Sequence, residues 1–261
     1  MLLLLVGIGM KYEDLTLQAI QAIESADLVI IDTYTSIHED INRIIELIGR
    51  KEVRLAKRSD LEGVGIERIV EEAARRKVAI LVPGDPLIAT THEAIRVEAA
   101  KRGVEVKVVN GLTVVSLAFS RSGLHFYKLG RTVTLTYDPS SVDYVLRVIQ
   151  DNTSRGLHTL ILLDWRAEES KAMTVQEAVS MLLEGDKEGL LAGRVGVGLA
   201  RLGFSDEYMV ADLVPNLGGY EYPGPPHSLI VTGDLHFMEV ESLRYNCGLP
   251  EKLYERLVKR L

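Results

Sequence analysis

The chain has 261 residues, of which 47% are hydrophobic and 26% are charged, a composition that is ordinary for a globular protein and argues against disorder. Its 30 basic and 37 acidic residues give a formal net charge of −7, so it lacks the positive field of a general nucleic-acid-binding protein, although a local basic patch is compatible with that total. Cys247 is the only cysteine, which excludes an intrachain disulfide and a cysteine-rich metal site and fits a reducing cytoplasm.

The first ten residues are apolar enough to resemble the core of a signal peptide. No basic residue precedes the apolar run, glycines interrupt it, and the charged segment 11–14 follows at once, so a buried first strand explains the run better. No later apolar run approaches the ~18 residues that a membrane-spanning helix needs. We therefore expect a soluble, cytoplasmic protein.

In the first half of the chain, short apolar runs alternate with longer amphipathic or charged segments. The apolar runs lack polar alternation, which is typical of strands buried on both faces. They predict strands at Leu2–Val6, Ala26–Ile31, Val78–Val82 and Val104–Val109. The segments between them predict helices at Leu15–Ala26, Ile41–Ile48, Glu67–Arg76 and Thr91–Arg102. Strands that alternate with helices indicate a parallel sheet built from crossover units.

The second half is patterned differently, with several short strands that have few helices between them. Strands are predicted at Thr132–Tyr137, His158–Leu163, Val195–Ala200, Tyr208–Ala211 and Leu229–Thr232. Helices are predicted at Val142–Gln150, Val175–Leu183, Phe237–Tyr245 and Leu253–Leu261. This pattern favours a mixed or largely antiparallel sheet. With a soft boundary near 111–122, the sequence predicts two α/β domains, residues 1–111 and 112–261.

Ligands bind beyond the carboxyl ends of the strands in open parallel sheets, so the loops there are the first places to look for a site. The first loop, Gly7–Met10, carries a Gly-x-Gly pair, but Tyr12 stands where a dinucleotide-binding fingerprint has its third glycine. A tight turn is the commoner reason for such a pair. The second loop, Asp32–Ser36, offers a carboxylate and hydroxyls to a polar ligand, although taken alone it is better explained as the capping turn of the next helix.

The third loop, Pro83–His92, is the strongest candidate. Two prolines and a glycine fix its backbone directly after a buried strand, which presents Asp85 and main-chain groups to a ligand. The structural alternative is a rigid turn in which Asp85 accepts hydrogen bonds from backbone amides. His92 on its own is more typical of a hydrogen-bonding residue on a helix face than of a catalyst.

Several common chemistries lack their motifs in this sequence. There is no phosphate-binding loop, no His-Glu-x-x-His pair and no Gly-x-Ser-x-Gly nucleophile elbow. None of the six histidines is spaced at i, i+4 from another, so we expect no metal site.

Seven segments together carry a resemblance to a known family. They are Gly7–Gly9, Asp32–Ser36, Gly84–His92, Gly123–Gly130, His158–Asp164, Pro225–Val231 and Leu235–Glu241. With them the chain resembles the tetrapyrrole-methylase-like superfamily of S-adenosylmethionine-dependent methyltransferases, and within it the diphthine synthase family. The Tyr-Thr-Ser, Ala-Thr-Thr-His and Pro-Pro-His strings are the most specific for that family. The chain departs from it at Asp32, where glutamate is usual, and in the stretch 110–114.

The resemblance implies a fold of two α/β domains, the first with a mainly parallel sheet and the second with a mixed sheet, and S-adenosylmethionine bound in the cleft between them. Since this cofactor has no phosphate, the missing phosphate-binding loop is expected. Apolar walls would suit its adenine, and polar side chains would suit its ribose and amino-acid ends. Carried over by position, the cofactor-binding residues are Met10, Asp85, Ile88, Thr113, Val114, Leu163, Leu202 and His227.

The resemblance also implies the reaction. The acceptor would be the amino group of a 3-amino-3-carboxypropyl-histidine on translation elongation factor 2, which is methylated repeatedly in diphthamide biosynthesis, with S-adenosylhomocysteine as the other product. The amine must be neutral to attack the methyl group, and Asp85, Tyr34 and His92 are the candidate bases. A homodimer is expected, and neither a nucleic acid nor a membrane is expected as a partner.

The sequence is also compatible with other functions. A methyltransferase of the same superfamily that acts on a tetrapyrrole would need several arginines for the substrate carboxylates, and one that acts on ribosomal RNA would favour a more basic chain. A non-catalytic module that binds S-adenosylmethionine is the third reading. Arg121, Lys128 and Arg131 form a basic cluster that is either a docking patch for the elongation factor or a solvated surface.

Overall fold

The computed structural model describes residues 1–260. The chain forms two compact units. Unit 1 comprises Met1–Val114 and Ala167–Glu169, and unit 2 comprises Val115–Arg166 and Ser170–Leu261. Each unit has its own sheet and its own apolar core, and each is described by itself below.

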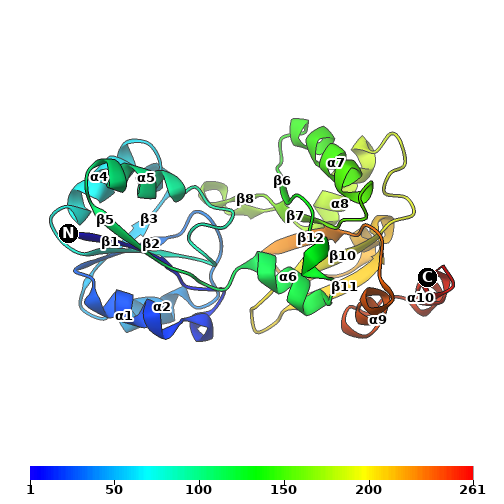
Figure 1. The fold of residues 1–261 in the computed structure, drawn as a ribbon, viewed down its shortest axis with the longest axis horizontal. Helices are drawn as coiled ribbons and strands as arrows, with labels where there is room; N and C mark the ends of the chain where they lie inside the picture. The colour runs from blue at the N-terminus through cyan, green and yellow to red at the C-terminus, as the bar shows by residue number, and fades with distance from the viewer. Residues whose placement is uncertain (261) are drawn as a thin grey trace. The chain divides into compact units, whose positions relative to one another are not determined.

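Unit 1 is built on a parallel five-stranded sheet with the order β3-β2-β4-β1-β5 (Figure 1). Its three inner strands, β2, β4 and β1, consist mainly of leucine, isoleucine and valine, as burial on both faces requires. The strands are β1 (Leu2–Gly7), β2 (Leu28–Asp32), β3 (Glu52–Ala56), β4 (Val78–Val82) and β5 (Glu105–Val109).

Helices cover both faces of this sheet. Successive residues of a strand point to opposite faces, so Leu3 and Leu5 pack with α4 and α5, whereas Leu4 and Val6 pack with α1 and α2. Figure 1 shows these two helix pairs on opposite faces of the sheet. Gly49, with φ of 71°, ends α2. The helices are α1 (Leu17–Ser25), α2 (Ile41–Ile48), α3 (Arg58–Leu61), α4 (Val64–Ala73) and α5 (Glu93–Lys101), with single 3-10 turns η1 (Tyr12–Asp14) and η3 (Ala167–Glu169).

Unit 2 is built on a mixed sheet with the order β11-β10-β12-β7-β6, in which only β6 and β7 run parallel. A two-stranded hairpin, β8 with β9, follows β7. The strands are β6 (Val133–Leu135), β7 (Thr159–Leu163), β8 (Trp165–Arg166), β9 (Lys171–Ala172), β10 (Val195–Ala200), β11 (Tyr208–Leu213) and β12 (His227–Val231).

The main core of unit 2 lies between this sheet, two helices, α7 and α8, and the 3-10 turn η4. Thr174 begins α8 with a capping box, in which its hydroxyl accepts from the N–H of Glu177 at 3.2 Å. The helices are α6 (Val114–Ser122), α7 (Ser140–Thr153), α8 (Val175–Gly185), α9 (Phe237–Asn246) and α10 (Glu251–Val258), with η2 (Phe126–Lys128) and η4 (Val214–Gly219).

The predicted α/β class, with a parallel sheet in the first half and a mixed sheet in the second, is confirmed. The helix predicted at Leu253–Leu261 is observed as α10 and begins two residues earlier; Leu261 itself lies outside the described residues. Within residues 1–260, no helix combines the length and the apolar character that crossing a membrane requires.

Candidate functional site

Four loops of unit 1 meet at one edge of its sheet. Because all five strands are parallel, their carboxyl ends lie at the same edge, and ligands of such sheets bind there. The loops are Gly7–Met10 after β1, Asp32–Ser36 after β2, Gly84–His92 after β4 and Asn110–Thr113 after β5. The three loops singled out from the sequence are therefore brought together.

The first and third loops are joined through their backbones. Gly9 and Gly84 form an antiparallel pair, in which the N–H of Gly84 donates to the carbonyl of Gly9 at 2.8 Å and the N–H of Gly9 donates to the carbonyl of Gly84 at 3.2 Å. Both residues have positive φ, 68° and 75°, a region that glycine enters without strain. The Gly-x-Gly pair therefore forms a tight turn whose backbone hydrogen bonds hold the first and third loops together.

The floor between these loops is closely packed backbone. A Cβ atom added to Gly7 would lie 2.5 Å from the amide nitrogen of Gly111 and 2.6 Å from the carbonyl oxygen of Gly84. No side chain fits there without moving the backbone. The glycines thus let the backbones at the ends of β1, β4 and β5 approach one another closely.

Asp85 joins the third loop to the fourth. Its carboxylate is 3% exposed; Oδ1 accepts from the N–H of Leu87 at 2.9 Å, and Oδ2 accepts from the side-chain amide of Asn110 at 2.9 Å and the N–H of Gly111 at 3.2 Å. Both oxygens of Asp85 are therefore occupied by donors of the protein. This is the structural role foreseen as an alternative for Asp85, and it gives the residue a positioning effect on any ligand held by the loops.

The other unit 1 residues predicted to bind the cofactor lie on the same loops. Met10 is buried, its N–H donates to Asp14, and its methyl end lies beside Gly84. Ile88 is 43% exposed, so its side chain is accessible to a ligand. Thr113 is the last residue of the fourth loop, and Val114 begins α6.

Asp32 and His92 join the second loop to the third. The Nε2 atom of His92 lies 3.3 Å from Oδ2 of Asp32, and both side chains are fully buried. Burial alone would raise the pKa of the Asp32 carboxyl, but the His92 imidazole, the Thr35 hydroxyl and the N–H of Tyr34 together lower it. Asp32 is therefore an ionised acceptor at the end of β2, whereas the sequence had offered it as a possible ligand-binding carboxylate but favoured a capping turn.

Tyr34 is held at both ends. Its N–H donates to Asp32 at 2.7 Å, and its hydroxyl donates to Oε1 of Glu62 at 3.1 Å. Burial and the charge of Glu62 raise the pKa of Tyr34, so the phenol keeps its proton at neutral pH. Arg58 completes this cluster with an ion pair to Glu62 at 3.0 Å.

Unit 2 contributes the remaining three predicted cofactor residues. His227 begins β12; its Nδ1 accepts from the N–H of Val175 at 3.1 Å, and its Nε2 donates to the carbonyl of Pro223 at 2.7 Å. Burial lowers the pKa of His227, so the ring is neutral with its proton on Nε2. Leu163 ends β7 half-buried, and Leu202 is buried after β10.

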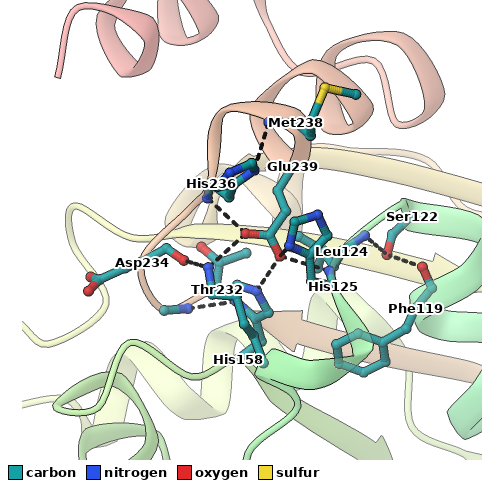
Figure 2. A network of polar contacts seen from close by, with 12 residues as sticks. Phe119, Ser122, Leu124, His125, His158, Thr232, Asp234, His236, Met238 and Glu239 are labelled. Carbon is teal, nitrogen blue, oxygen red and sulfur yellow. Dashed lines mark hydrogen bonds and ion pairs between the residues drawn. The ribbon is translucent and has the colours of Figure 1, made fainter. Parts of the chain in front are cut away.

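A separate polar cluster, which lies in unit 2, surrounds Glu239 (Figure 2). This carboxylate is fully buried and accepts from four donors, the Nε2 of His158 at 2.8 Å, the Nζ of Lys128 at 2.7 Å and the N–H groups of His125 and His236, both at 2.8 Å. Although burial alone would raise the pKa of Glu239, these donors lower it far below its ordinary value. Lys128 is thus committed to Glu239.

The charges of the four ligand loops limit the ligands that fit. The loops contain two buried carboxylates, Asp32 and Asp85, and none of their residues is lysine or arginine. A phosphate or a molecule with many carboxylates would find no countercharge there, whereas a ligand with a sulfonium or ammonium group is attracted. The site therefore fits S-adenosylmethionine better than a nucleotide. Within residues 1–260, no group of three or more histidine, cysteine or acidic side chains is placed to hold a metal ion.

Comparison with known proteins identifies the family. Residues 2–215 match the model of the Tetrapyrrole (Corrin/Porphyrin) Methylases. The chain is 50% identical to the diphthine synthase of Staphylothermus marinus over 259 residues, an alignment that covers 98% of this chain and 97% of the relative. It is 40% identical to the diphthine synthase of Methanopyrus kandleri over 240 residues, which are 88% of this chain and 89% of that relative. The chain belongs to the diphthine synthase family.

Solved structures agree with this membership. A crystal structure of diphthine synthase superposes with a TM-score of 0.90 at 34% identity and covers 98% of this chain and 99% of its own. The tetrapyrrole methylase family uses S-adenosylmethionine, so the predicted cofactor and the predicted methyltransferase class are both confirmed. The assignment of single residues to cofactor binding or catalysis stays a prediction.

Proposed function

We propose that this chain methylates the amino group of the 3-amino-3-carboxypropyl-histidine of translation elongation factor 2, repeatedly, in diphthamide biosynthesis. The observation that carries the proposal is the 50% identity to a diphthine synthase over nearly the whole length of both chains. The charges of the ligand loops support it independently, because loops without lysine or arginine suit a cationic cofactor and disfavour a substrate with many carboxylates.

The proposed cofactor contacts of unit 1 are Met10, Asp85, Ile88, Thr113 and Val114. Those of unit 2 are Leu163, Leu202 and His227. When bound, S-adenosylmethionine supplies a methyl group already activated by its sulfonium. The chain's own residues then hold and orient the partners: the glycine floor admits the cofactor close to the backbone, and Asp85 keeps the third and fourth loops in register.

None of the three candidate bases offers an accessible proton-accepting atom in this structure. Both oxygens of Asp85 carry donors, the Tyr34 phenol keeps its proton, and the His92 imidazole is fully buried. We therefore propose that these residues act through binding and orientation, and that the acceptor amine loses its proton to solvent. Orientation alone supplies several orders of magnitude of rate.

The decisive experiment measures transfer of radiolabelled methyl groups from S-adenosylmethionine. The acceptors are elongation factor 2 carrying the 3-amino-3-carboxypropyl group, uroporphyrinogen and ribosomal RNA. We expect label on the elongation factor alone, and more than one methyl group per histidine by mass spectrometry. Label on a tetrapyrrole or on RNA would assign the chain to another methyltransferase class, and cofactor binding without any transfer would make it a binding module.

The proposed protein partner needs a docking surface, and the basic cluster was one candidate. Two of its three charges already have partners: Arg121 lies 3.5 Å from Glu207, and Lys128 is bound by Glu239. Arg131 stacks on the ring of Tyr144 at 5.4 Å. A homodimer is also proposed from the family resemblance, and light scattering of the purified protein tests it.

A further inference from the structure

The contact between Asp32 and His92 has no assigned role. Asp32 is the last residue of β2, and His92 directly precedes α5 at the end of the loop that follows β4. Because β2 and β4 are neighbours in the sheet, the two side chains connect adjacent ligand loops. The Nε2 of His92 lies 3.3 Å from Oδ2 of Asp32, and neither side chain is accessible to solvent.

Asp32 organises the second loop. Its Oδ1 accepts from the N–H groups of Tyr34 at 2.7 Å and Thr35 at 3.0 Å, and its Oδ2 accepts from the Thr35 hydroxyl. The same Oδ2 faces the His92 ring. One ionised carboxylate therefore fixes the turn 33–35 and ties it to the start of α5.

His92 is polar and buried but incompletely satisfied. The contact with Asp32 has ion-pair distance without hydrogen-bond geometry, and neither ring nitrogen has a hydrogen-bond partner among residues 1–260. A buried polar ring without partners is costly, and an apolar residue would fill the same volume at lower cost. An unsatisfied polar group in a native structure needs an explanation, and a functional role is one of the explanations.

We propose that Asp32 and His92 form a positioning pair, which holds the Tyr34–Thr35 turn against the 84–91 loop and so sets the approach of the methyl acceptor. This inference rests on the proposed function. Since the imidazole is fully buried, His92 acts through Asp32 and the turn, and it does not touch the acceptor. The pair therefore affects the use of the acceptor far more than the binding of the cofactor.

The test compares four variants of the full chain, Asp32→Asn, His92→Ala, His92→Gln and the double variant Asp32→Asn/His92→Ala. Thermal unfolding first establishes that each variant is folded. Calorimetry gives the dissociation constant of S-adenosylmethionine, and methyl transfer to the modified elongation factor gives kcat and KM for the acceptor across pH. Arg96→Ala, on the exposed side of α5, is the matched control and should behave as wild type.

We expect Asp32→Asn and His92→Ala each to lower kcat/KM for the acceptor by about ten- to a hundredfold, because small misplacements of reacting groups have effects of that size. The dissociation constant of the cofactor should stay within about threefold, and the shape of the pH profile should not change. The double variant should be no worse than the worse single variant, since the two residues act as one unit. His92→Gln, whose amide can reach Oδ2, should recover part of the rate.

Three results would contradict the proposal that Asp32 and His92 act as a positioning pair. Additive losses in the double variant would mean that the residues act independently. Loss of the acidic limb of the pH profile in His92→Ala alone would make His92 a general base. A cofactor affinity that falls in parallel with the rate would show a merely structural role.

Amide hydrogen exchange separates this inference from the proposed function. Both Asp32→Asn and His92→Ala should lower protection in the segment 33–36 and leave unit 2 unchanged. If the wild-type chain does not methylate the elongation factor, the proposed function fails. Amide hydrogen exchange in the segment 33–36 still tests whether Asp32 and His92 hold the turn. Unchanged protection at 33–36 in His92→Ala would then refute it.

Discussion

The two units each bury a carboxylate against a histidine, and the two pairs are satisfied to different degrees. In unit 2, Glu239 receives four donors, and its partner His158 uses both ring nitrogens, since Nδ1 accepts from the N–H of Gly233 at 3.0 Å (Figure 2). In unit 1, Asp32 is well satisfied but its partner His92 has no hydrogen bond.

We interpret this difference as that between a structural cluster and the proposed positioning pair. The Glu239 cluster ties the chain around 125–128 and 158 to the start of α9 and needs nothing further, so it serves the stability of unit 2. The Asp32–His92 pair lies at the edge of the unit 1 sheet where parallel sheets bind ligands. The free-energy cost of its unsatisfied His92 ring is offset by other interactions of the fold, as is usual for incompletely satisfied polar groups at functional sites. Variants in the two units test whether the two pairs differ in this way.

The largest expected effect is on stability. Glu239→Gln leaves the Lys128 ammonium and the His158 ring without a carboxylate in a buried site, so we expect the free energy of unfolding to fall by about 3 kcal/mol or more. Asp32→Asn keeps an acceptor for the backbone amides and should lower it by about 1 kcal/mol. Urea unfolding followed by circular dichroism measures both. Equal losses would remove the distinction between the clusters.

The next effect is on cofactor affinity. Gly111→Ala introduces a Cβ that would lie 2.8 Å from the carbonyl carbon of Gly7 and would overlap the carbonyl oxygen of Gly84, so the floor of the site must shift. We expect the dissociation constant of S-adenosylmethionine, measured by calorimetry, to rise at least about tenfold. The matched control is Gly193→Ala in unit 2, where a Cβ meets no atom within 4 Å. Wild-type affinity in Gly111→Ala would place the cofactor elsewhere.

Asp85→Ala should act in the same direction with a smaller effect. The change releases the side chain of Asn110 and the N–H of Gly111, which loosens the fourth loop without closing the site. We expect cofactor binding to weaken by up to about tenfold, the loss of one or two hydrogen bonds. Asp85→Asn retains an acceptor, so its dissociation constant for the cofactor should lie between those of Asp85→Ala and wild type. An unchanged dissociation constant in Asp85→Ala would take Asp85 out of the site.

The smallest effect is the acid dependence of stability. The folded state lowers the pKa of Glu239, so the unfolded chain binds more protons and the stabilisation is present in full above the ordinary glutamate pKa of about 4.3 and is lost as the pH falls below it. The melting temperature of wild type should therefore fall more steeply between about pH 5 and pH 3 than that of Glu239→Gln. Parallel curves for the two proteins would contradict this assignment.

Much of the fold was predictable because its strands are either uniformly apolar or bounded by sharp turn signals. Val78–Val82 and Val195–Ala200 are strands with the predicted bounds. The edge strand β3, Glu52–Ala56, was missed because Glu52 and Arg54 interrupt its apolar residues, so it has no continuous apolar run. Helix α4 begins at Val64, three residues before the predicted start, since Gly63 with φ of 53° forms its N-cap.

The candidate site was predictable only in part. A strand followed by Pro-Gly-Asp-Pro marked the third loop, and parallel topology explained why the other loops join it. The contacts that give the residues their roles, from Asp85 to Gly111 and from His92 to Asp32, join segments far apart in the chain. Neither spacing nor periodicity encodes such contacts. Asp32 could have been found from its position alone, as a carboxylate that ends a buried strand next to the third loop.

The lone cysteine has a practical consequence. Cys247 is 1% exposed at the end of α9, its thiol lies 4.0 Å from the carbonyl of Ser122, and burial raises its pKa to about 12. Because only an accessible thiolate attacks thiol reagents, the native chain should be nearly inert to them. A cysteine introduced on the surface of either unit could therefore be labelled selectively without removing any natural residue. Pairs of such labels would report the distance between the units in solution, with and without cofactor.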